Sequence, residues 1–141
     1  MVAEVTVDGA GGRVRLPRAW AAVDSGHVIN PDGLANQIEG GIVQSTSWTL
    51  HEAVRFDRNG ITSRDWSSYP ILTMPEGPHV EVELIDRPNE GPLGSGEGSQ
   101  GPAAAAMSMR WPMRPANACA SCRSPPSGSR QRIAQPIDLT A

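Results

Sequence analysis

The sequence predicts an α+β fold, in which antiparallel strands and a hairpin combine with one or two helices. Residues 79–85 alternate between apolar and polar side chains, which is the period of a half-buried strand. Between residues 34 and 42 a large apolar side chain recurs at every fourth position, which is typical of a helix. Asn59 and Gly60 stand between two strand-like runs, where this pair favours a hairpin turn.

The amino-terminal part of the chain predicts two strands. Residues 2–7 and 13–22 are both strand-like, and the glycine-rich residues 9–12 between them suit a turn. The first residues have neither the charged nor the apolar region of a signal peptide. A strand that starts at once leads us to expect that the sequence enters a domain midway.

A helix is predicted over residues 34–46. Asn30 can cap it, and Pro31 suits its first turn because that position needs no backbone N–H donor. Gly40 and Gly41 interrupt this helix, each at a cost of roughly 1 kcal/mol relative to alanine. Two readings stay open for them: a neighbour packs closely against the helix, or the helix frays there.

The hairpin is expected to pair residues 54–58 with residues 61–64 across a two-residue Asn59-Gly60 turn. The strand at residues 79–85 should then bury its valines and leucine on one face and expose its glutamates on the other. Residues 86–102 are expected to form a loop. A helix should begin at residues 103–106.

Residues 107–141 contain five prolines and no periodicity, so their composition predicts a disordered tail. This tail holds Cys119 and Cys122, which form one C-x-x-C pair. A zinc site needs further ligands, and the three histidines are scattered, so we predict no metal site. A small redox or zinc protein remains the weakest of three functional readings.

Composition narrows the classes of partner. The net charge is -3 and no basic stripe is present, which argues against nucleic acid. No apolar run approaches the roughly 18 residues of a membrane span. Because hydrophobic residues make up 38% and aromatic residues 4% of the chain, the material for an independent core is thin. The compartment stays unknown.

Residues 91–102 hold five glycines and one carboxylate, that of Glu97. Glycines let a backbone approach a bulky ligand closely, and a carboxylate held beside that ligand could act as a general base. The alternative is a solvated linker, because Gly, Ser and Pro are common in linkers.

Taken in order, the motifs of residues 1–106 resemble the C-terminal part of the molybdopterin-binding large subunit of the xanthine dehydrogenase/aldehyde oxidase family. Within that family they look most similar to isoquinoline 1-oxidoreductase and aldehyde dehydrogenase large subunits. Each motif alone is weak, but five in the family's order and spacing are specific. The matching segments are residues 23–33, 36–43, 65–70 with Met74, 80–84 and 94–106.

The resemblance implies a molybdenum hydroxylase, which oxidises an aldehyde or an N-heterocyclic aromatic carbon with oxygen derived from water. It implies a molybdenum–molybdopterin cofactor in its cytosine dinucleotide form. It also implies iron–sulfur clusters on a small partner subunit or domain, and an upstream part of the large subunit. The substrate stays open, because the family's selectivity lies largely in segments that are not present here.

By its position in the motif, Glu97 matches the family's general base, whose pKa burial would raise. Gln37 matches the family glutamine that hydrogen-bonds the cofactor, and an amide suits that task because it both donates and accepts. Gln37 could instead be an ordinary amide on the helix surface. Four glycines complete the implied cofactor-binding set: Gly40, Gly41, Gly96 and Gly98.

The chain departs from the family in two respects. Family subunits are several times longer, and the match stops at Ala106, which predicts a family part at 1–106 and a non-family tail at 107–141. A lost base near codon 107 would explain the tail, since permitted codons read in another frame give a family-like helix. We therefore expect a truncated fragment that is inactive alone. The alternative is a non-catalytic α+β piece or pseudogene product that only packs against a partner.

Overall fold

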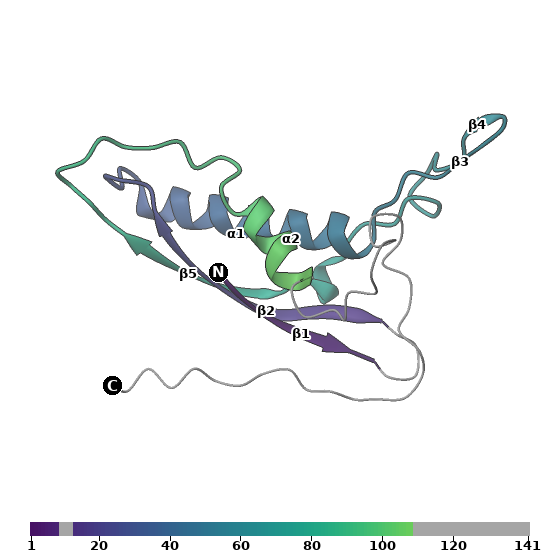
Figure 1. Cartoon of the computed structure of the whole chain (residues 1–141), viewed down its shortest axis with the longest axis horizontal. Coiled ribbons are helices and arrows are strands. Elements are labelled where there is room, and N and C mark those ends of the chain that lie inside the picture. Colours follow the sequence, from purple (N-terminus) through teal and green to yellow (C-terminus); the bar gives the residue numbers. More distant parts are fainter. Residues whose placement is uncertain (9–12, 109–141) are drawn as a thin grey trace.

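The computed structural model describes residues 1–8 and 13–108. In this part of the chain a three-stranded sheet with the order β1-β2-β5 is covered on one face by two helices, α1 and α2 (Figure 1). The strands are β1 (Val2–Val7), β2 (Val14–Asp24) and β5 (His79–Ile85), and the helices are α1 (Pro31–Leu50) and α2 (Gln100–Ser108). The predicted α+β class is confirmed.

The pairing of the strands is mixed. β1 and β2 are antiparallel, as the sequence predicts, but β2 and β5 run parallel, with Arg18 opposite His79 and Asp24 opposite Ile85. The expectation of antiparallel strands is therefore wrong for β5. An alternating pattern shows which face of a strand is buried, but it does not reveal the direction of the neighbouring strand.

A bulge lies where β1 and β2 pair irregularly, between Glu4 and Thr6. Pro17 lies in the same stretch of β2, and a proline is tolerated in a strand at such an irregularity because it lacks the N–H that a regular ladder needs. Beyond it, Ala19 and Ala21 point into the core. The small alanine side chains leave room for a helix to pack close to the sheet.

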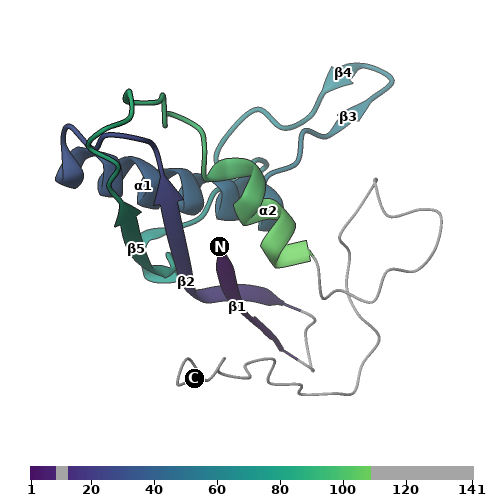
Figure 2. The ribbon, with the colours of Figure 1, turned by 60° about the vertical axis from the view of Figure 1, so that its left-hand side comes forward.

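The core lies between the sheet and the two helices. α1 contacts β5 and β2, and α2 contacts β1 and crosses α1, an arrangement that is clear in Figure 2. The buried apolar residues come from all these layers and are Leu16, Ala19, Ala21, Ile38, Ile42, Ala103 and Met107. Burial of Met107 at 6% exposure means that the packed part of the chain reaches past the predicted boundary at residue 106.

α1 begins as the sequence predicts and ends later. The Asn30 side chain accepts a hydrogen bond from Gly33 N at 3.0 Å, and Pro31 occupies the first turn. The helix continues to Leu50 rather than to Thr46. One long-range and one local hydrogen bond hold the extra turn: Ser47 Oγ accepts from Leu72 N at 3.0 Å and donates to Glu52 Oε1 at 2.5 Å.

Residues 52–73 form an arm that projects from the body and carries the hairpin β3 (Phe56–Asp57) and β4 (Gly60–Ile61) (Figures 1 and 2). The hairpin exists, but its turn is Arg58-Asn59, one residue earlier than predicted. Asp57 Oδ1 accepts the Asn59 N–H at 2.7 Å, which starts the turn at Asp57. Gly60, with φ +125°, lies on β4 opposite Asp57.

β5 has the predicted bounds, and its two valines and its leucine are half-buried while Glu81 and Glu83 are exposed. A short 3-10 helix, η1 (Met74–Glu76), precedes it. α2 begins at Gln100, earlier than the expected start at Ala103. The cysteine pair and the predicted disordered tail lie outside the described residues.

Candidate functional site

The site is built where β2 ends and two loops meet the start of α1. Residues 25–30 connect β2 to α1, and residues 86–99 connect β5 to α2. Because β2 and β5 are parallel, both loops leave the same end of the sheet. This topology brings Gln37 and the glycine-rich loop together, although they are far apart in the sequence.

The loop at residues 86–99, which contains most of the glycine-rich segment, is anchored to the loop at residues 25–30. Arg87 N donates to Gly26 O at 3.0 Å, and Leu93 N donates to Ser25 O at 2.9 Å. The hydroxyls of Ser25 and Ser95 lie 2.7 Å apart. An ion pair between Arg87 Nε and Asp24 Oδ2, at 2.5 Å, adds a tie at the end of β2. These contacts argue against a solvated linker.

Gly26 is the glycine that this arrangement requires most. Its φ is +70°, in the left-handed region that other residues avoid, and a Cβ there would collide with the carbonyl oxygen of Gly91. Sequence reasoning gave Gly26 no role. The signal that could have found it is its place between a strand end and a helix cap, where a tight turn is needed.

An open cleft of about 330 Å³ lies between the two loops and the first turns of α1. Asn30, Leu34 and Gln37 of the α1 side face it, and Leu93, Ser95 and Gly96 line the opposite wall. Its mixture of apolar side chains and a few polar groups is typical of sites for organic ligands.

Gln37 lies where the two walls meet. Its Nε2 donates a hydrogen bond to Gly96 O at 2.7 Å. Among the described residues, nothing donates to the Gln37 Oε1, so an acceptor and a second N–H remain available. The structure therefore brings together two residues that the sequence singled out, Gln37 and Gly96.

Glu97 directly follows Gly96, and its side chain is exposed. The sequence led us to expect a buried carboxylate with a raised pKa. No described residue covers the outer side of this loop, so the burial is absent here. The Glu97 backbone is nevertheless held, because its carbonyl oxygen accepts from Gln100 N at 3.2 Å at the start of α2.

The remaining glycines of the predicted set fall into two groups. Gly41 is buried, and the place of its missing Cβ is filled by Ser99 Oγ. Gly40, Gly96 and Gly98 have neither a positive φ nor a described neighbour within 4 Å of where a Cβ would stand. The described part of the chain thus does not require these three to be glycine, and their cofactor-binding role stays a prediction.

The same glycines leave room for a bulky cofactor. Gly94 is equally open, so this loop presents bare backbone, with no described neighbour within 4 Å of where the Cβ atoms would stand. Together with the free amide oxygen of Gln37, this backbone fits a flat group rich in hydrogen-bonding edges, such as a pterin.

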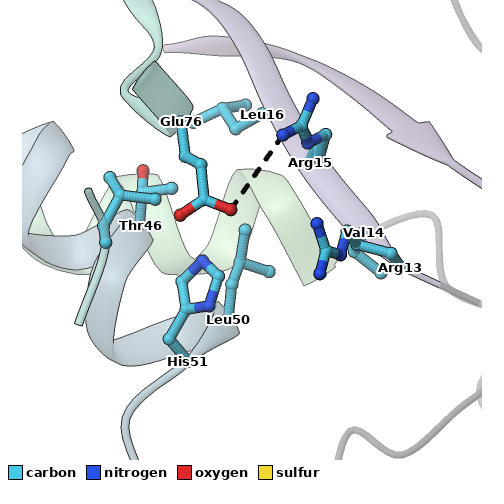
Figure 3. A pocket seen from close by; sticks show the side chains of 9 residues that line it. Arg13, Val14, Arg15, Leu16, Thr46, Leu50, His51 and Glu76 are labelled. Atoms are coloured by element: carbon cyan, nitrogen blue, oxygen red, sulfur yellow. Dashed lines mark ion pairs between the residues drawn. The ribbon is translucent and has the colours of Figure 1, made fainter. Parts of the chain in front are cut away.

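A second, much smaller cavity of about 10 Å³ lies near the C-terminal end of α1 (Figure 3). There Glu76 lies 4.0 Å from Arg15 Nη2, and the hydrogen bond from Thr73, with smaller contributions from His51 and Arg13, lowers the pKa of Glu76. This volume holds one water at most, so we interpret the cluster as a structural junction between β2 and η1.

No group of three or more His, Cys, Asp or Glu side chains in residues 1–8 and 13–108 could hold a metal ion. Within the same ranges, neither helix has the length and apolar character that crossing a bilayer demands.

Comparison with known proteins agrees with the geometry. Residues 1–78, more than half of the chain, match the molybdopterin cofactor-binding domain family. The chain is 43% identical over 106 residues to a nicotinate dehydrogenase subunit of Pseudomonas putida, which covers 75% of this chain and 9% of that protein. It is 34% identical over 86 residues to the beta subunit of isoquinoline 1-oxidoreductase of Brevundimonas diminuta, which covers 61% and 11%.

The structure is similar to the crystal structure of quinoline 2-oxidoreductase from Pseudomonas putida 86, with a TM-score of 0.66 and 30% identity. That match covers 72% of this chain and 14% of the solved chain. The chain thus spans about a tenth of the length of the curated relatives above. The chain belongs to the molybdopterin cofactor-binding domain family, among the molybdenum-binding subunits of the xanthine dehydrogenase type.

Proposed function

We propose that this chain supplies Gln37 and Glu97 to the active site of a molybdenum hydroxylase that oxidises an aldehyde or an N-heterocyclic aromatic carbon. The observation that carries the proposal is the 2.7 Å contact between Gln37 Nε2 and Gly96 O at the wall of the cleft. It brings two motifs of the family to one place, immediately beside the only carboxylate of the glycine-rich loop.

The cofactor is molybdenum–molybdopterin in its cytosine dinucleotide form, and when bound it supplies the two-electron oxidation with oxygen derived from water. Gln37 holds it through the amide oxygen and the N–H that the bond to Gly96 leaves free. The bare backbone at Gly96 and Gly98 allows it to approach without a Cβ in the way.

Glu97 is the general base in this proposal. A carboxylate oxygen of Glu97 takes a proton from the attacking oxygen, and a metal that acidifies bound water makes a carboxylate a sufficient base. Its exposure in this chain leaves room for further protein or cofactor to cover it.

The partners in this proposal are the rest of a large subunit and a small subunit with iron–sulfur clusters. The relatives named above are themselves called subunits, which supports an assembly. Because the cleft is open to solvent, we propose that the chain alone does not retain the cofactor and is inactive. Bound molybdenum together with dye-linked aldehyde or N-heterocycle oxidation by the purified chain would contradict this.

A segment exchange tests the function. Residues 1–106 would replace the homologous segment of the Pseudomonas putida nicotinate dehydrogenase, to whose matching subunit this chain is 43% identical over 106 residues. We expect the chimera to bind molybdenum and oxidise nicotinate. Glu97→Gln should keep the metal and lose at least about 100-fold in kcat, in line with the usual contribution of general base catalysis.

The matched control is Glu83→Gln, because Glu83 is an exposed carboxylate on β5 outside the cleft. It should leave kcat and metal content unchanged. If the chimera loads molybdenum and Glu97→Gln retains full activity, Glu97 is not the base and the proposal fails.

A second candidate is a non-catalytic packing role, which one observation favours. The arm at residues 52–73 and η1 expose several large apolar side chains, with Phe56 79%, Trp66 76% and Met74 94% exposed. Exposed apolar side chains grouped on a projecting arm are typical of a protein interface. This role predicts a chimera that assembles but responds to changes in the arm and not to Glu97→Gln.

A further inference from the structure

We infer that Gly41 and Ser99 form a lock that positions Glu97 against α1, so that both are positioning residues rather than cofactor contacts. The inference rests on the proposed function only for the role of Glu97. Ser99 is 7% exposed, and its Oγ donates to the carbonyl oxygen of Ile38 in α1 at 2.9 Å. This hydroxyl lies directly where Gly41 has no side chain.

The lock depends on the absence of a Cβ at Gly41. A methyl group there would collide with Ser99 Oγ, whereas its next neighbours, Gln100 Cγ and Ser99 Cβ, would stand at 3.6 and 3.7 Å, which is ordinary contact. The collision therefore involves one atom. Gly40, the adjacent helical residue, has nothing within 4 Å and cannot take part.

Further hydrogen bonds extend the lock to both sides of Glu97. Upstream, Gln37 Nε2 holds Gly96 O at 2.7 Å. Downstream, Ser45 Oγ donates to Gln100 O at 2.8 Å. Since the chain is tied to α1 before and after Glu97, the Glu97 main chain has little freedom although its side chain is exposed.

The buried side of α2 completes the arrangement. Ala103 N donates to Ser99 O at 3.0 Å, and the Ala103 side chain is fully buried in the core. The position of Ser99 is thus fixed by the hydrophobic core as well as by α1. Such a link matters for catalysis, because a misplacement of about 1 Å can cost about 100-fold in rate.

A double-mutant cycle between positions 41 and 99 tests the lock in the full 141-residue chain, without cofactor. Gly41→Ala should lower the unfolding midpoint by roughly 5–10 °C, because overpacking outweighs the better helix propensity of alanine. Ser99→Ala removes the one colliding atom, so the Gly41→Ala, Ser99→Ala double variant should unfold at a higher temperature than Gly41→Ala alone. Additive effects would overturn the lock.

Hydrogen exchange of the amides at residues 96–100 measures the position of the loop directly. Ser99→Ala adds no bulk, so it should fold and should speed this exchange by about fivefold, the effect of one lost hydrogen bond. Unchanged exchange would overturn the inference even where Gly41→Ala fails to fold. Gly40→Ala is the matched control, and it should leave exchange in the loop unchanged.

The chimeric enzyme separates this inference from the proposed function. There Ser99→Ala should lower kcat with little change in KM, because the base is displaced while the substrate pocket is intact. If the effects of the changes at positions 41 and 99 are not additive but the Glu97→Gln chimera stays active, the lock is supported and the proposed function is contradicted. If those effects are additive but the Glu97→Gln chimera is inactive, the lock is contradicted and the proposed function is supported.

Discussion

Gln37 of α1 donates its side-chain N–H to the carbonyl oxygen of Gly96 at 2.7 Å, across a gap of 59 positions in the sequence. A replacement that keeps the size of Gln37 but cannot donate, Gln37→Leu, should lower the free energy of unfolding by about 0.5 kcal/mol. This is the low end for a hydrogen bond, because water reaches the exposed partners. Urea titration measures it.

The control is Asn36→Leu, since Asn36 is the adjacent exposed amide and its side chain makes no hydrogen bond within the described ranges. If Asn36→Leu lowered the free energy of unfolding as much as Gln37→Leu does, the contact between Gln37 and Gly96 would contribute nothing to stability. Exchange of the Gly96 region should rise only in the Gln37 variant.

Gly26→Ala should destabilise the chain by about 2–4 kcal/mol. Its φ of +70° disfavours alanine, and the new Cβ would meet the backbone oxygen of Gly91, which cannot rotate away. Thermal or urea unfolding measures the loss. Gly94→Ala is the control, because Gly94 has open space and no positive φ, and it should stay within about 0.5 kcal/mol of the parent.

Asp65 should titrate with a pKa of about 2, below its ordinary 3.8, chiefly because the Ser68 side chain donates to it, with Ser67 as the second donor. Because the folded-state pKa is depressed, ionised Asp65 stabilises the turn at pH values above its ordinary pKa. This stabilisation is lost as the pH falls from about 4 to about 2. Carboxyl NMR shifts would follow this titration.

The hydroxyls of Ser67 and Ser68 should differ in how far their removal raises the pKa of Asp65. Ser68→Ala should raise the pKa of Asp65 further than Ser67→Ala does, because the hydrogen bond from the Ser68 hydroxyl, at 2.7 Å, is the largest cause of the lowered pKa. The reverse order, or a parent pKa near the ordinary value, would show that this turn is not formed in solution.

Tyr69 provides a probe of how the two ends of the arm are held together. Its hydroxyl donates to Glu52 Oε2 at 2.8 Å, and this hydrogen bond raises the pKa of Tyr69 above its ordinary value. The stabilisation is present below the ordinary pKa and is lost as the pH rises through the raised one. Glu52→Gln should bring the pKa of Tyr69 back down.

Because Tyr69 is the only tyrosine of the chain, phenolate absorbance reports it alone. Glu81→Gln, which changes an exposed carboxylate on β5, should leave the titration unaltered. An equal pKa in the parent and in Glu52→Gln would mean that this pair does not hold the two ends of the arm together.

Local signals in the sequence predicted local structure well. Asn30 and Pro31 marked the start of α1, and the alternation at residues 79–85 gave β5 its bounds. The hairpin turn was placed one residue late because the Asp57 side chain, rather than the Asn59-Gly60 pair, starts it. Competition between side-chain and backbone hydrogen bonds decides such cases.

Tertiary relations were harder to predict. The sequence could not show that β5 pairs parallel with β2, since the alternation of apolar and polar side chains does not depend on the direction of the neighbouring strand. The close packing suspected at Gly40 and Gly41 is real only at Gly41, and the neighbour is Ser99 of the same chain. Ser99 itself was not singled out, because one serine in a glycine-rich loop has no periodicity to mark it.

The parallel pairing of β2 with β5 has a kinetic consequence. Residues 18–24 pair with residues 79–85 across a stretch of sequence that contains the whole of α1 and the arm, so this pairing is not between neighbouring segments. Closing so long a loop is entropically costly before any contact compensates for it. During synthesis the edge of β2 that pairs with β5 therefore stays unpaired until residues 79–85 have left the ribosome.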